Sequence, residues 1–163
     1  MRIRKVKHVT AENADKISIV FEKKSPTNQN AWDEFSLICN QRAAPQFYAA
    51  LKDLAQDVID LCELPQGYLD RVSVKGVSVS ISGEKDTMGA VITASMQLLK
   101  SNQPLNINTP HKTEEFYAET GDEAQLLNKD TVRRLYALFN EAERYVDGER
   151  EQTMLPLEAP KGS

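Results

Sequence analysis

The most regular pattern of hydrophobic and polar positions runs from residue 72 to residue 99 and predicts a long β-hairpin. In its first strand the hydrophobic positions change parity at Lys75 and Gly76. Because side chains alternate across a strand with a period of two, this change predicts a β-bulge that bends the strand. The returning strand keeps one parity from Met88 to Leu98. Such a bent hairpin is typical of a small barrel or of a strongly curved sheet.

Before this hairpin, the pattern predicts further strands and then a helix. Alternating hydrophobic and polar residues predict strands over residues 2–10, 16–24 and 32–39. Pro45 suits the first turn of a helix, where its missing N–H group costs nothing. Hydrophobic residues spaced by three and four from Phe47 to Leu61 predict an amphipathic helix that ends near residues 64–67.

The order strand, strand, strand, helix, strand, strand makes the expected fold class α+β. It is the order of the OB-fold, a five-stranded Greek-key barrel that binds oligonucleotides and oligosaccharides. A five-stranded antiparallel curved sheet with the helix on one face fits the same pattern, and both architectures stay open. An added C-terminal helix is predicted over about residues 130–147, with Asn128 or Asp130 as N-cap and Gly148 just past its end. Its hydrophobic stripe packs on the sheet or, alternatively, on a second copy in a homo-oligomer.

Residues 100–125 show no sustained periodicity and contain Pro104 and Pro110. A loop of about 25 residues is uncommon inside a compact domain and is usually functional or disordered. Leu105 and Ile107 alternate, so we expect a short extended piece that docks on a neighbouring strand, with Phe116 and Tyr117 as anchors at the far end.

At 163 residues the chain is long enough for one domain with a hydrophobic core. We expect a single α+β domain over residues 1–148 and a flexible, mostly polar tail over residues 149–163. No hydrophobic run approaches the roughly 20 residues that span a bilayer, and no signal-peptide core follows the basic start. The expected location is therefore the cytoplasm, without membrane contact.

The net charge of −4 hides a gradient along the chain. Residues 1–50 hold eight Lys and Arg against five Asp and Glu, whereas residues 101–163 hold seven against twelve. A basic front and an acidic rear are typical of single-strand-binding proteins, in which an acidic tail competes with nucleic acid for a basic groove. The alternative is that the acidic helix surface only keeps the protein in solution.

Little in the sequence points to catalysis. The two histidines, His8 and His111, have no cysteine or carboxylate at metal-ligand spacing, and no P-loop, nucleophile elbow or dinucleotide turn occurs. Cys39 and Cys62 also fit no metal spacing and are expected to be buried thiols. Three acids on the first helix, at positions 53, 57 and 60, are interpreted as a solvated face rather than a site for a hard cation. We expect a protein without enzymatic activity, cofactor or metal.

A candidate nucleic-acid site lies on the first three strands, where basic side chains could follow phosphates and aromatic side chains could stack on bases. Its members are Arg2, Arg4, Lys5, Lys7, Lys23, Lys24, Trp32 and Phe35. The alternative for Trp32 is a core or rim residue.

Three segments together resemble a family of small uncharacterised proteins of bacteriophages and prophages: Gly76 to Ser78, Met88 to Ile92, and Asn106 to Lys112. The resemblance covers most of residues 3–148 and implies a phage context in a bacterial cytoplasm. It implies no activity and no functional residue.

In the tail, Gln152 to Leu157 resembles the peptide with which replication proteins bind the bacterial sliding clamp. In such a peptide the apolar anchors enter a pocket while the glutamine bonds to nearby backbone, which assigns Gln152, Leu155 and Leu157 as partner-binding residues. The alternative is an incidental apolar patch.

The charge gradient and the candidate site predict a single-stranded DNA-binding accessory protein of replication or recombination, and the resemblance implies that it is phage-encoded. The alternative is a phage host-interaction or anti-defence protein. It would bind a host protein or a small nucleotide signal through the loop from Asn102 to Tyr117.

Overall fold

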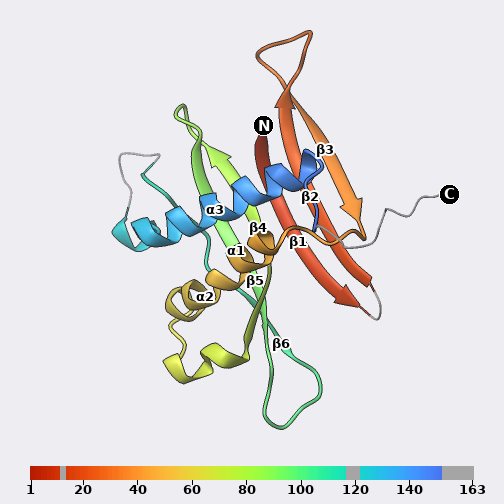
Figure 1. Ribbon diagram of the computed structural model, residues 1–163. Helices are drawn as coiled ribbons and strands as arrows, with labels where there is room; N and C mark the ends of the chain where they lie inside the picture. The colour runs from red at the N-terminus through yellow and green to blue at the C-terminus, as the bar shows by residue number, and fades with distance from the viewer. Residues whose placement is uncertain (12–13, 117–121, 152–163) are drawn as a thin grey trace, which may run out of the picture.

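The computed structural model describes residues 1–11, 14–116 and 122–151. Its centre is an antiparallel sheet in which the strand order is β3-β2-β1-β4-β5-β6, and β7 pairs with β5 as well. Helices α1, α2 and α3 lie on the same side of this sheet (Figure 1). The strands are β1 (Arg2–Ala11), β2 (Ala14–Lys24), β3 (Trp32–Cys39), β4 (Val72–Ser82), β5 (Thr87–Met96), β6 (Leu105–Asn108) and β7 (Lys112–Thr113).

The bent hairpin is confirmed. Strands β4 and β5 pair along their whole length, and the register shifts between Val74 and Gly76, where the parity change predicts a bulge. At this bulge β4 comes so close to β1 that a Cβ atom on Gly76 would lie 2.1 Å from the carbonyl oxygen of Val6. Only glycine fits there. A second bulge, between Ile3 and Lys5 of β1, has no counterpart in the sequence prediction.

The sheet is curved and open, so of the two predicted architectures the antiparallel α+β sheet is the one observed. β3 and β6 lie at opposite ends of the strand order and do not close a barrel. The sheet has seven strands rather than five because the segment after residue 100 contributes two. β6 pairs with β5, with Ile107 opposite Ala94, as the alternation of Leu105 and Ile107 predicts.

The predicted first helix is two helices, α1 (Pro45–Asp53) and α2 (Ala55–Leu61), which meet at the fully buried Leu54. A short 3₁₀ helix, η1 (Gln66–Arg71), leads into β4, and η2 (Glu123–Gln125) precedes the last helix. The C-terminal helix, α3 (Lys129–Val146), is confirmed: the Asn128 side chain accepts a hydrogen bond from the N–H group of Thr131 at 2.8 Å. Gly148 just past its end has a φ of 110°, a conformation that favours glycine.

The core lies between the helices and one face of the sheet, with side chains such as Ile19, Val77, Ile92 and Leu135 nearly or fully buried. No helix among the described residues is both long and apolar enough to cross a bilayer. Cys39 and Cys62 are half-buried and free, and burial raises the pKa of Cys62.

The prediction of a solvated acidic face on the first helix is wrong for Asp57. Its side chain is fully buried and accepts hydrogen bonds from Arg134 Nε at 2.8 Å, Arg134 Nη2 at 2.7 Å and Thr131 Oγ1 at 2.6 Å. This ion pair ties α2 to the start of α3. Asp53 and Asp60 are exposed, as predicted.

Candidate nucleic-acid interface

The face of the sheet opposite the helices holds most of the predicted cations. Val6 pairs with Ile19 and Val77, and all three are buried in the core. Because neighbouring residues point to opposite faces, Lys5 and Lys7 on either side of Val6 point away from the core. We call this uncovered surface the open face. By strand register its basic residues are Arg2, Lys5, Lys7, Lys16 and Lys24, and its acidic residues are Glu22 and Glu34. Two bulge residues join them through their contacts: Arg4 donates a hydrogen bond to Glu22, and Lys75 lines a hollow with Lys5 and Lys7.

At one end of the open face, two arginines are already engaged. Arg2 Nε lies 3.3 Å from Glu22 Oε1 in an ion pair without hydrogen-bond geometry, and its guanidinium lies 3.6 Å from the centre of the Trp32 ring. Arg4 donates a hydrogen bond to the same glutamate oxygen at 3.1 Å. The charge of these arginines is therefore partly balanced, and a base could stack on the Arg2 side of Trp32 only by displacing Arg2.

The eight predicted residues do not share one surface. Lys24 pairs with Trp32 on the open face, but Lys23 and Phe35 have the parity of Phe21 and point to the helix side. The Phe35 ring stacks on the Phe21 ring with 5.5 Å between centroids, although Phe35 is 45% exposed at the sheet edge. One nucleic-acid strand on the open face would therefore contact six of the eight.

In the middle of the open face, Lys5, Lys7 and Lys75 line a hollow of about 140 Å³, whose other lining residues include Gly76, Ser78 and Thr93. We call it the lysine hollow. Within residues 1–11, 14–116 and 122–151, no carboxylate oxygen lies within ion-pair distance of these three ammonium groups. Lys75 was not among the predicted site residues. The parity change at 75–76 could have identified it, because a bulge adds one residue whose side chain departs from the strand's alternation.

Further along β4, the open face holds a serine–histidine contact. Ser80 Oγ lies 2.7 Å from His111 Nε2, and both atoms lie over Gly89. A Cβ atom on Gly89 would come within 2.5 Å of the serine oxygen, so the glycine makes room for this contact. In the described part of the chain, no three His, Cys, Asp or Glu side chains are grouped so as to hold a metal ion.

On the helix side, a polar cluster joins the β1–β2 hairpin to α1. Asp15 accepts hydrogen bonds from His8 Nε2 and from the Tyr48 hydroxyl, and it accepts one from Arg42 Nη1 at 3.1 Å. Burial raises the pKa of Asp15, but the hydrogen bonds from His8 and Tyr48 and the nearby charges outweigh burial and hold it below its usual value. Burial and the bond to Asp15 raise the pKa of Tyr48 to about 12. The cluster thus links the β1–β2 hairpin to Tyr48 of α1.

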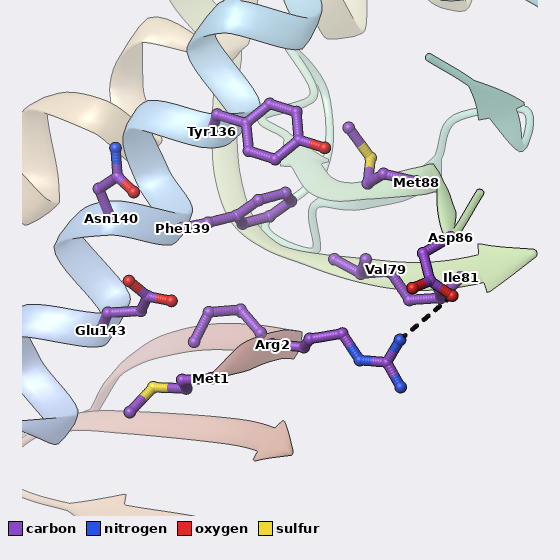
Figure 2. Close-up of a pocket in the computed structure, with 11 residues that line it drawn as sticks. Met1, Arg2, Val79, Ile81, Asp86, Met88, Tyr136, Phe139, Asn140 and Glu143 are labelled. Carbon is purple, nitrogen blue, oxygen red and sulfur yellow. Dashed lines mark ion pairs between the residues drawn. The ribbon is translucent and has the colours of Figure 1, made fainter. Parts of the chain in front are cut away.

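The larger cleft in Figure 2 has a different character. Its volume is about 320 Å³, and it lies between α3 and the ends of β1, β4 and β5. Tyr136 and Phe139 from the helix face Val79, Ile81 and Met88 across it (Figure 2). Several polar groups at its rim are already paired: Arg2 with Asp86 at 3.5 Å, and the Tyr136 hydroxyl with Glu114 Oε2 at 2.8 Å. The cleft can accept apolar surface, but it gathers no charge of one sign.

The other residues with a predicted binding or anchoring role belong to the C-terminal tail and to the long loop. Residues 149–151 contact the domain: the Arg150 guanidinium lies 3.6 Å from the centre of the Tyr145 ring, and the N–H group of Glu151 donates to the Arg42 carbonyl at 3.0 Å. The clamp-peptide residues Gln152, Leu155 and Leu157 lie outside the described residues, as does Tyr117. Their roles therefore stay predictions.

No family model, no curated protein and no solved structure matches this chain. The resemblance to phage proteins consequently rests on the sequence segments alone. The residues of the open face must carry any conclusion about function.

Proposed function

We propose that the open face of the sheet binds single-stranded DNA and that the protein serves as a non-enzymatic accessory of replication or recombination in a phage-infected bacterial cytoplasm. The observation that supports this best is the segregation of charge. Seven basic residues, five placed by register and two at bulges, share the open face with two acidic residues, although the whole chain has a net charge of −4. Cations on one face attract the phosphate backbone of a nucleic acid. The excess of acidic residues in the rest of the chain makes the distribution of charge over the surface uneven.

The expected binding mode is dominated by phosphate contacts. Trp32 is the one aromatic side chain of strands β1 to β6 that the register places on the open face, and Arg2 already covers one side of its ring. Stacking, which is worth about 1–3 kcal/mol per base, therefore contributes at one position at most. We expect little sequence preference, steep salt dependence and a Kd of roughly 10⁻⁶ to 10⁻⁴ M near physiological salt.

Fluorescence anisotropy with a labelled oligothymidine over a series of salt concentrations tests this proposal. Replacing Lys5, Lys7 and Lys75 by glutamine should weaken binding and reduce the slope of log K against log salt by about 2, since each single-strand phosphate contact contributes about 0.7. The control replaces Lys23, Lys52 and Lys129, which lie away from the open face and change the net charge equally. Equal slopes for the two triple variants, or no oligonucleotide binding by the unmodified protein, would refute it.

A second candidate function is binding of a host protein at the β5–β6 turn. Leu99 is 81% exposed and Leu105 is 47% exposed, and β6 lies at the end of the sheet opposite β3. An extended peptide can add a strand to such an edge while apolar side chains fill pockets. In a pull-down from bacterial lysate, the variant with both leucines replaced by serine should lose a specific partner protein. The glutamine variant at Lys5, Lys7 and Lys75 should still retain that partner. Retention by both variants would exclude this surface.

A further inference from the structure

We infer that the lysine hollow binds a phosphate dianion and so makes the protein prefer single strands that end in a phosphate. This inference rests on the proposed function, because it assigns a particular chemical group to a particular place on the same face. The dianion could also come from a small nucleotide or from inorganic phosphate, and the experiment below separates these sources.

The bulge in β4 builds the hollow. Val74 pairs with Ala94 and Gly76 pairs with Thr93, so Lys75 is the extra residue with no partner on β5. Across β1, Gly76 pairs with Lys7, and Ser78 pairs with Lys5. The bulge thus brings one more lysine beside two that the register already places on the open face. A regular strand would not gather three.

The glycine keeps the hollow empty. Any side chain on Gly76 would meet the β1 backbone, since its Cβ atom would lie 2.1 Å from the carbonyl oxygen of Val6 and 3.1 Å from the Cα atom of Lys7. The position is therefore closed to larger residues, and the space between the lysines stays open to a ligand. About 140 Å³ is room for one small anionic group rather than for a base.

The charge balance favours a dianion. Three lysines line the hollow, and no acidic side chain lines it. An internal phosphodiester has one negative charge, whereas a phosphomonoester has about −1.5 to −2 near neutral pH. The monoester therefore balances the lysines better. It also presents three acceptor oxygens to ammonium donors.

Of the two hydroxyl groups that line the hollow, one is available to donate a hydrogen bond to a ligand. The Thr93 hydroxyl donates to Asn108 Oδ1 at 3.0 Å, so its proton is already used. Ser78 is exposed and makes no side-chain hydrogen bond within the described part of the chain. Its hydroxyl can turn towards a phosphate oxygen. The hollow therefore combines three cations with one neutral donor.

The experiment compares oligothymidines of equal length that end in a 5′-phosphate, a 3′-phosphate or hydroxyl groups only, each labelled at the other end. We expect the unmodified protein to bind a phosphorylated end about fivefold more tightly, because one further unit charge near 4 Å from a single ammonium gains that factor even in bulk water. The glutamine triple variant at Lys5, Lys7 and Lys75 should lose the preference. The control triple at Lys23, Lys52 and Lys129 should keep it. Circular dichroism confirms that each variant is folded.

Inorganic phosphate and thymidine 5′-monophosphate, titrated by isothermal calorimetry, complete the test. If all oligothymidines bind equally, the dianion inference is overturned while the proposed function stands. If no oligonucleotide binds but either small ligand binds the unmodified protein and not the lysine variant, the hollow is a phosphate site and the proposed function fails. If no ligand binds, both are overturned.

Discussion

Removing Arg134, whose partly exposed guanidinium pairs with a buried carboxylate, should destabilise the protein strongly. Its guanidinium makes two hydrogen bonds to Asp57, whose carboxylate is fully buried and receives a third bond from Thr131. In the Arg134→Ala variant the carboxylate would stay buried with its charge uncompensated. Breaking a buried pair in this way costs about 3–5 kcal/mol.

Most of that cost comes from the carboxylate left behind, so a double variant should recover it. Replacing Asp57 by valine and Arg134 by methionine removes both charges and changes the combined side-chain volume little, and such exchanges are often neutral or stabilising. The matched control is Arg133→Ala on the same helix. Its pair with Asp130 is 71% and 73% exposed, so we expect a change within about 0.5 kcal/mol.

Urea unfolding followed by circular dichroism measures all three free energies. Arg134→Ala should lower the midpoint strongly at constant m-value, and its Tm should fall by about 10 °C for a chain of this size. A loss below about 1 kcal/mol for Arg134→Ala would refute the reasoning, and so would a double variant that is less stable than Arg134→Ala itself. A small loss would mean that water reaches the Asp57 carboxylate, whereas a less stable double variant would mean that most of the cost does not come from that carboxylate.

Four further outcomes follow from other parts of the molecule. Gly76→Ala should destabilise the fold by several kcal/mol in thermal unfolding, because its Cβ atom would overlap the β1 backbone; near-native stability would mean that the two strands separate easily. The pKa of Asp15 is held low, so the stabilising effect of its carboxylate should be complete above about pH 4 and vanish as the pH falls through the folded pKa. The measurement is the difference in unfolding free energy between the unmodified protein and Asp15→Asn over a series of acidic pH values. The pKa of Tyr48 is raised to about 12, so its contribution should be complete below about pH 10 and be lost as the pH rises through 12; an unchanged alkaline midpoint in Tyr48→Phe would contradict this. If the tail binds the sliding clamp, the Kd of this complex should be micromolar. The double variant Gln152→Ala, Leu155→Ala should abolish clamp binding and leave the Tm of the protein unchanged. A Tm lower by several degrees would show that the tail packs on the domain.

Local patterns predicted the strands well, and the reason is physical. The polar–apolar alternation of 32–39 and the parity change at 75–76 are set by which face each residue buries, so they survive in the sequence alone. The same rule could have separated Trp32 from Phe35, since residues three apart in a strand point to opposite faces. Residue type alone does not distinguish the two faces of β3, whereas parity does.

What the sequence did not show depends on contacts between distant segments. Asp57 is buried because Arg134 reaches it from 77 residues away, and an acid on a helix looks the same in the sequence whether or not such a partner exists. The break at Leu54 has no glycine or proline to mark it. The two additional strands were only partly visible, as the alternation of Leu105 and Ile107 indicated one of them.

The outer edge of β3 affects how copies of this protein meet at high concentration. A free strand edge exposes unpaired N–H and C=O groups that can join another sheet, which is a common route to aggregation. Asp33 and Glu34 are both exposed on this strand, and two copies aligned side by side in parallel register would bring like charges together. Ile38, which is 62% exposed further along the strand, has no charged residue next to it in β3. Removing the two acids should therefore favour pairing of the β3 edges of two copies.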